Sequence, residues 1–370
     1  MKKEVNCVIS GTGVFTPAES LSNDELVESF NHSVDLNVKD EPKEKLYSNV
    51  EFIEKASGIK NRFVINKSGI LDPKVMHPVL PRREDHELSL QAEISLVAAQ
   101  EALEQSQRKG SEIDCVIVSC SNMQRPYPSI SIEIQKALGA QGFAYDMTVA
   151  CSSATFAIAN ASFMIETGQA ERVLVLSPEI CSAQLNYTDR DSHFIFGDAC
   201  TAVVLENKSS VKAKEYFEVM DSYLKTDFSN NIRSNFGFLN RLELDDSGLE
   251  EKLFVQKGRK VFKEVCSMVP VHVKKQLGKF DIPAAQVKKL WLHQANLSMN
   301  EFIAKKILEE DITKERVPTV LDRYGNTSSA GSIIAFHLHR DDFCENELGV
   351  ICSFGAGYSM GSILIKKVTL

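Results

Sequence analysis

The sequence lacks the marks of a secreted or membrane-bound protein. None of its 370 residues falls in an apolar run long enough to cross a bilayer. The start, "MKKEVNCVISGTGVF", holds an apolar run that is far too short for a signal peptide, and a charged residue sits inside it. We therefore expect a cytoplasmic protein without a membrane partner.

Paired cysteines and an excess of positive charge are also missing. The nine cysteines are odd in number and include no CxxC pair, which argues against a disulfide framework and a zinc site. We expect most of them to be reduced core residues, and we expect no metal. The formal net charge of −8 argues against binding to nucleic acid.

What the chain does contain is a regular alternation of strand-like and helix-like segments. Residues 89–106, "SLQAEISLVAAQEALEQS", have helical periodicity, and residues 113–121, "IDCVIVSCS", read as a fully buried strand. Residues 287–296, "VKKLWLHQAN", read as a strand that ends on His293. This alternation predicts an α/β fold with buried parallel strands, because parallel strands need helical crossovers.

Weak internal similarity predicts a duplicated domain. The segment "FIFGDACTAVVLE" resembles "CSFGAGYSMGSILI" in its Phe-Gly pair, its small residues and its apolar strand. The chain is also longer than one core comfortably serves. We expect two βαβαβ halves, residues 1–210 and 211–370, the first carrying the candidate cysteine and the second the candidate histidine and asparagine.

Two segments fit this alternation poorly. Residues 64–88 and 222–250 are rich in charge and in residues that form turns. Loops of this length are often functional. We expect lids or pocket walls, with mere decoration of the fold as the alternative.

Cys151 is the first candidate for chemistry. It lies in "YDMTVACSSATFAIANA", between a strand-like run and a predicted helix, among small residues. The free N–H groups and the dipole at a helix start stabilise a thiolate, and small neighbours leave room for a thioester. The alternative is an ordinary core cysteine.

Three further motifs lie in the second half. His293 in "WLHQAN" follows a strand, where ligands of α/β sheets are met, although it could be a buried histidine with satisfied hydrogen bonds. Asn326 in "DRYGNTSSAGS" could equally be a turn residue or a helix cap. The glycine-rich "SFGAGYSMG" offers exposed backbone N–H groups or simply a hairpin turn.

In this order the motifs resemble the thiolase superfamily, and most closely the 3-oxoacyl-[acyl-carrier-protein] synthase III family. The similarity covers nearly the whole chain and includes "GTGVFTP", "GIKNRF", "PSISIEIQKALG" and "FGDACTAVVL". It implies a thiolase fold, with the two halves stacked into αβαβα layers. It also implies decarboxylative Claisen condensation of an acyl thioester primer with malonyl-[acyl-carrier-protein], initiating fatty acid or related acyl-chain synthesis.

The resemblance assigns roles to particular residues. Cys151 would carry the acyl group, while the backbone N–H groups of Cys151 and Ala356 would form the oxyanion hole. His293 and Asn326 would donate hydrogen bonds to the enolate, and Phe354 would border the site. No cofactor is implied, since coenzyme A and phosphopantetheine thioesters are the substrates.

Other positions concern substrate choice. Tyr127 would cap the acyl tunnel of the other protomer in a homodimer, or be only an interface aromatic. Phe52 and Ala56 replace a tryptophan and an arginine that sandwich the adenine of coenzyme A in typical members, and Ser298 replaces another family arginine. Arg190 matches an arginine on the coenzyme side. We therefore expect a primer in the C6–C10 range, supplied by acyl-CoA or by an acyl-carrier protein.

Basic residues near the start of a predicted helix offer a docking patch for the acidic carrier protein, or simply a solvated face: Lys257, Arg259, Lys260 and Lys263.

Other activities of the same fold remain open. A specialised condensing enzyme of polyketide or alkylquinolone type is the main alternative. Head-to-head condensation needs a carboxylate near Tyr127, where Gln124 and Arg125 supply none. Hydroxymethylglutaryl synthase chemistry also needs a carboxylate and lacks "GNTS". A non-catalytic partner subunit would be expected to have lost Cys151 or His293.

Overall fold

The computed structural model describes residues 5–37, 46–244, 248, 252–310 and 312–369. Part of the predicted segment 222–250, namely residues 245–247 and 249–250, therefore lies outside the described residues.

A nine-stranded sheet runs through both halves of the chain. Its order is β11-β12-β13-β8-β1-β7-β6-β4-β5. The strands are β1 (Cys7–Phe15), β4 (Cys115–Ser119), β5 (Phe143–Met147), β6 (Arg172–Ile180), β7 (Asp198–Asn207), β8 (Glu215–Ser229), β11 (Val287–Leu292), β12 (Leu348–Gly355) and β13 (Gly357–Thr369).

The sheet is mixed rather than mainly parallel. Strand β4 pairs in parallel with β5 and β6, and β11 with β12, but the other five pairs are antiparallel. The continuous apolar runs correctly predicted buried strands. Their direction was partly wrong, because burial on both faces makes an antiparallel strand as apolar as a parallel one.

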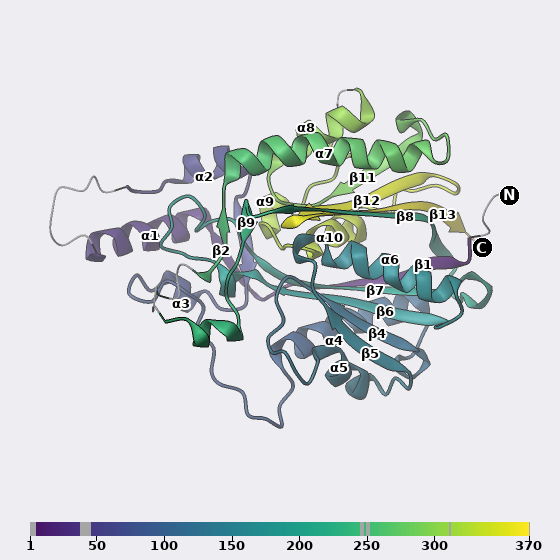
Figure 1. The fold of residues 1–370 in the computed structure, drawn as a ribbon, viewed down its shortest axis with the longest axis horizontal. Helices are drawn as coiled ribbons and strands as arrows, with labels where there is room; N and C mark the ends of the chain where they lie inside the picture. Colours follow the sequence, from purple (N-terminus) through teal and green to yellow (C-terminus); the bar gives the residue numbers. More distant parts are fainter. Residues whose placement is uncertain (1–4, 38–45, 245–247, 249–251, 311, 370) are drawn as a thin grey trace.

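Helices cover the sheet in layers, so that Figure 1 shows five layers of αβαβα type, as the sequence predicted. Helices α6 (Ser153–Glu166) and α10 (Ala330–Leu338) lie between the two parts of the sheet. Helices α7 (Gly258–Gly278) and α8 (Leu297–Leu308) cover one outer face, and α4 (Leu90–Ser106) and α5 (Ile130–Leu138) the other. One apolar core surrounds the central helices α6 and α10 and reaches both parts of the sheet, and a separate core lies under each outer pair of helices.

Short elements gather at one end of the sheet, the left-hand side of Figure 1. They are β2 (Glu19–Ser22), α1 (Asn23–Asn37), α2 (Val50–Ser57), β3 (Asn61–Val64), α3 (Ser68–Leu71), β9 (Ile232–Arg233), β10 (Val255–Gln256) and α9 (Leu321–Tyr324). Many of them share a fourth apolar core.

Local sequence explains where several helices begin and end. The Ser22 hydroxyl accepts a hydrogen bond from Glu25 N (3.2 Å), and the Glu25 carboxylate accepts one from Ser22 N (2.9 Å), which is a capping box. Ser22, rather than Asn23, therefore caps α1. Gly139 ends α5 with φ +69°, a conformation that glycine adopts without strain.

The prediction that residues 222–250 form a loop is partly wrong. Residues 222–229 form the second half of β8, which pairs with β13 along its length. This half of β8 is half-buried or exposed, so its polar sequence hides the strand. Backbone hydrogen bonds to β13, and not burial of its own side chains, hold this half of β8 in the sheet.

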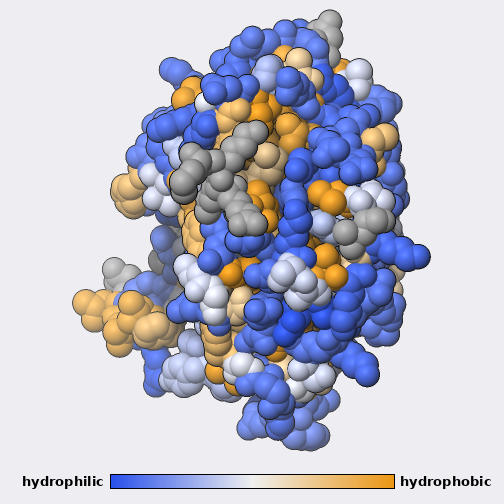
Figure 2. All heavy atoms as spheres, turned by 90° about the vertical axis from the view of Figure 1, so that its right-hand side faces the viewer, coloured by the Kyte–Doolittle hydropathy of each residue, from blue (hydrophilic) through white to orange (hydrophobic). Residues whose placement is uncertain are grey.

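The end of the molecule that carries both termini is predominantly hydrophilic, with apolar side chains showing mainly between elements and on one projecting lobe (Figure 2). Among the described residues, no helix combines the length and the apolar character needed to cross a membrane.

Candidate active site

Cys151 lies in a single tight turn, Ala150–Ser152, that leads into α6. Ala150 has φ +44°, a strained conformation for a residue other than glycine, and such strain clusters at functional sites. Gly355, at the end of β12, packs against the thiol. A Cβ at Gly355 would lie 2.9 Å from Cys151 Sγ, so only glycine fits there.

Burial dominates the electrostatics of this thiol. It raises the pKa of Cys151 to about 11, although the Ser328 side chain and the backbone N–H groups of Ala356 and Cys151 oppose the rise. The negative charge of Glu179 adds to it. The backbone donors at the helix start thus act in the predicted direction, but desolvation outweighs them, so the pKa of the thiol stays above its usual value.

His293 immediately follows β11, and its backbone N–H donates to Cys352 O (2.8 Å). The ring is 2% exposed, and the edge of the Phe354 ring meets it at a centroid distance of 5.2 Å. Burial lowers the pKa of His293 to about 4, so the imidazole is neutral at neutral pH. Within the described residues, Nδ1 has no hydrogen-bond partner.

Both backbone groups of Asn326, its N–H and its carbonyl, are hydrogen-bonded. Its N–H donates to Ile195 O (2.9 Å), and its carbonyl accepts from Gly197 N (3.1 Å). The side-chain Oδ1 accepts a hydrogen bond from Ser328 N (2.9 Å). The turn therefore uses only Oδ1 and does not engage the side-chain amide N–H₂ group.

Cys151, His293 and Asn326 all line one cavity of about 520 Å³, a size typical of small-molecule sites. Most of its wall is apolar. The apolar lining comprises Phe52, Phe194, Ile195, Phe196, Ile232, Phe254, Val261, Phe262, Val265, Met299 and Phe354.

Comparison with known proteins agrees with this geometry. Family models described as 3-oxoacyl-[acyl-carrier-protein] synthase III and its C-terminal part match residues 145–227 and 277–367. A β-ketodecanoyl-[acyl-carrier-protein] synthase of Pseudomonas aeruginosa is 55% identical over 320 residues, which is 86% of this chain and 91% of that protein. The chain belongs to the 3-oxoacyl-[acyl-carrier-protein] synthase III family.

More distant relatives extend the similarity over the whole chain. A β-ketoacyl-[acyl-carrier-protein] synthase III of Bartonella henselae is 28% identical over 98% of this chain and 99% of its own length. The crystal structure of a synthase III from Aquifex aeolicus superposes with a TM-score of 0.76 at 24% identity, covering 97% and 99% of the two chains. The predicted fold and the predicted class, a condensing acyltransferase, are confirmed.

The residues that line the cavity include two that the family resemblance singled out, Phe52 and Ala56. Arg190 does not line the cavity itself. Its guanidinium instead stacks over the Phe52 ring at 4.1 Å, and its Nε donates to Tyr47 O (2.8 Å). Ser298 is exposed at the start of α8. The structure therefore brings Arg190 against Phe52, which lines the cavity.

Tyr127 is 81% exposed on the loop before α5 and does not line the cavity of its own chain. At the start of α7 the basic residues are exposed, and one of them, Arg259, also lines the cavity; they are Lys257, Arg259, Lys260 and Lys263.

The two unusual segments differ in their relation to the cavity. Residues 64–88 contribute none of the cavity-lining residues, whereas Ile232, within 222–250, is one of them. Sequence reasoning missed the aromatic wall. Two signals could have revealed it: the aromatic run "HFIFGD" before β7, and the α7 residues Val261, Phe262 and Val265, whose spacing places them on one helix face.

Proposed function

We propose that this chain condenses a medium-chain acyl thioester with malonyl-[acyl-carrier-protein] to give a 3-oxoacyl-[acyl-carrier-protein]. One observation carries the proposal: Cys151, neutral His293 and the amide of Asn326 converge on one cavity with a largely apolar wall. The first group can hold an acyl chain, and the other two can hold an enolate.

In the first step, Cys151 Sγ bonds to the primer's carbonyl carbon, and the bond to the carrier sulfur breaks. The thiol proton must leave, since burial keeps Cys151 protonated. Neutral His293 faces the same cavity and can take this proton and return it to the departing thiolate. The N–H groups of Cys151 and Ala356 would stabilise the tetrahedral oxyanion.

In the second step, the malonyl C–CO₂ bond breaks, and its electron pair forms an enolate of the carrier thioester. The enolate carbon attacks the acyl-Cys151 carbonyl, CO₂ departs, and the Cys151 thiolate leaves and takes up a proton from water. The imidazole N–H and the Asn326 amide would hold the enolate oxygen. A neutral imidazole suits this role, because an imidazolium could protonate the enolate and end the reaction early.

A primer of about eight carbons fits the chemistry. The relative from Pseudomonas aeruginosa is named for a ten-carbon product, which corresponds to an eight-carbon primer plus two carbons from malonate. Each buried methylene contributes about 0.8 kcal/mol. The apolar wall can therefore supply binding energy where a phenylalanine, Phe52, stands in place of the larger tryptophan.

Docking of the acidic carrier at the start of α7 follows from charge. Four cations lie in or next to the first turns of this 21-residue helix, and its first turn holds no acidic residue. Positive charge is unfavourable at a helix N-terminus, so an anionic partner that binds there would offset the repulsion between these cations and the helix dipole.

We also propose a homodimer in which Tyr127 closes the other protomer's cavity.

The test is a series of C2 to C12 acyl-CoA and acyl-carrier donors, each offered with malonyl-[acyl-carrier-protein]. We expect acyl-Cys151 by mass spectrometry and the highest kcat/KM between C6 and C10. An optimum at acetyl-CoA would contradict the medium-chain assignment. Absence of any acyl adduct on Cys151 would favour a non-catalytic partner subunit.

A further inference from the structure

Glu179 is a buried carboxylate beside the candidate site that the reaction above does not use. It lies near the end of β6 and is 1% exposed. No lysine, arginine or histidine pairs with it among the described residues, although a buried charge normally has such a partner. Its partners are instead two serines from distant parts of the chain and the thiol of Cys181, which donates to Oε2 (3.7 Å).

One serine belongs to the turn that carries Asn326. Glu179 Oε1 accepts hydrogen bonds from Ser329 N (3.1 Å) and from the Ser329 hydroxyl. The preceding residue, Ser328, has φ +49° and donates its N–H to Asn326 Oδ1. Such a conformation persists only when its surroundings hold it in place. Glu179 therefore fixes the end of the turn that orients the Asn326 amide.

The other serine belongs to the strand end that supports Cys151. Ser121 donates to Glu179 through its N–H (3.1 Å) and its hydroxyl (2.6 Å). The Ser153 hydroxyl accepts Val149 N (2.8 Å) and shares its one proton between Ala150 O (2.7 Å) and the neighbouring carbonyl of Cys120 (3.1 Å). Val149 and Ser153 flank the Cys151 turn. A continuous chain of hydrogen bonds thus joins the two candidate functional turns.

We propose that Glu179 is a positioning residue that sets the Asn326 amide opposite Cys151 during condensation. The inference rests on the proposed function. A carboxylate suits this place, because every hydrogen bond to it comes from a donor: the N–H and O–H groups of two serines and the S–H group of Cys181. Glutamine would keep the size but turn an N–H₂ group toward those donors, so at least one of the serine contacts would be lost.

The two half-reactions should respond differently. The Cys151 turn has further support, since the Ser152 hydroxyl donates to Ser359 O (3.0 Å). The Ser328–Ser329 end of the other turn depends on Glu179. We expect Glu179→Gln to keep Cys151 acylation within about threefold, and to lower malonyl decarboxylation about 100-fold, the typical effect of a misplacement of about 1 Å.

The experiment measures both half-reactions in the wild type, Glu179→Gln and the control Glu206→Gln. Glu206 is also fully buried, on the neighbouring strand, but near the opposite end of the sheet. We expect the control to change neither rate per folded molecule. Equal losses of both half-reactions in Glu179→Gln, or no loss, would overturn the proposal, since a merely structural residue would not separate them.

If Glu179→Gln does not fold, Ser329→Ala decides the question. It removes one donor to Glu179 and should lower decarboxylation about tenfold while acylation stays unchanged. An unchanged decarboxylation rate in this variant would overturn the proposal. A wild type that releases no CO₂ would overturn the proposed function together with this inference, whereas an active wild type with an equally active Glu179→Gln overturns the inference alone.

Discussion

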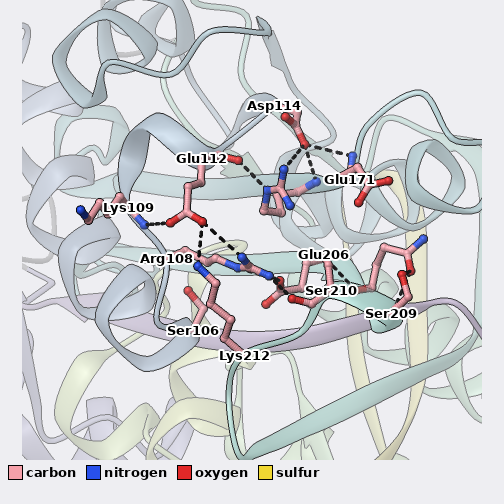
Figure 3. Close-up of polar contacts among 12 residues, drawn as sticks. Ser106, Arg108, Lys109, Glu112, Asp114, Glu171, Glu206, Ser209, Ser210 and Lys212 are labelled. Carbon is pink, nitrogen blue, oxygen red and sulfur yellow. Dashed lines mark hydrogen bonds and ion pairs between the residues drawn. The ribbon is translucent and has the colours of Figure 1, made fainter.

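Two buried glutamates lie at opposite ends of the same pair of strands and have different partners. Glu179 stands near the carboxyl end of β6, opposite Ala199, while Glu206 stands near the end of β7, opposite Arg172. Glu206 Oε2 accepts two hydrogen bonds from the Arg108 guanidinium, whose Nη1 also lies 3.2 Å from Glu112 (Figure 3). Glu179 has only neutral donors.

The difference separates two uses of a buried charge. The Arg108 cluster ties the end of α4 to β7 with paired charges far from the cavity, which suits a structural role. In the Glu179 cluster no cation in the described part of the chain pairs with the carboxyl group, so burial raises the pKa of Glu179, and its charge in turn helps to raise the pKa of the Cys151 thiol. The Glu179 cluster makes the Cys151 thiol harder to ionise. We therefore explain the cluster by the positions it gives the two turns, and not by a contribution to the stability of the fold.

The largest expected effect concerns Cys151 itself. Cys151→Ala should reduce condensation to background and remove the acyl adduct, because none of the other eight cysteines lines the cavity and seven of them are buried. With a pKa of about 11, the thiolate fraction should rise about tenfold per pH unit. Iodoacetamide labelling should follow that slope from pH 7 to 9.

This labelling is best measured in a Cys344→Ser background, which removes the exposed thiol. A plateau below pH 8 would mean that the helix start does produce a thiolate. Acylation found on Cys115 or Cys352, with Cys151 free, would remove Cys151 from the mechanism.

The next effect concerns the turn that Glu179 supports. Asn326→Ala should lower malonyl decarboxylation by about 10²–10³-fold, because one donor to the enolate is lost. Acylation of Cys151 should remain, and it serves as the internal control in the same preparation. Normal decarboxylation in this variant would make Asn326 a turn residue only.

At the opposite end of the sheet, the expected effect is on stability. Glu206→Gln removes the charge that neutralises buried Arg108, and should lower the free energy of unfolding by about 3 kcal/mol. Thermal or urea unfolding followed by circular dichroism measures this, with kcat per folded enzyme unchanged. If Glu206→Gln lost activity but not stability, Glu206 would act on the reaction and not on the stability of the fold, contrary to our assignment.

Much of this organisation could be predicted from the sequence. Apolar runs located the buried strands, and the motifs around Cys151, His293 and Asn326 predicted that these residues would meet in space. Periodicity could not locate the outer half of β8, whose partner β13 lies more than a hundred residues further along the chain. The sequence also could not predict the ionisation state of the Cys151 thiol, because its desolvation depends on all the elements that surround it.

Glu179 shows a second reason for failure. In "RVLVLSPEI" it stands at the end of an apolar strand, where a charged residue normally marks the return to solvent. Its burial results from the later "SSA" turn and from Ser121, both distant in sequence. Hydrogen-bond networks of this kind follow no local period, so the sequence pattern could not indicate them.

The smallest expected effect concerns primer length and Tyr127. This residue is 81% exposed in a single chain, so it can influence the cavity only through a second copy. Tyr127→Ala should move the optimum by one or two carbons, since one methylene changes kcat/KM about fourfold when it is buried. The measurement is kcat/KM over the acyl series, with sedimentation to follow the oligomeric state.

Phe238→Ala, which removes a similarly exposed aromatic (80%), is the matched control. An unchanged series in Tyr127→Ala would show that the neighbouring copy does not reach the acyl chain, and that this end of the site is complete within one chain.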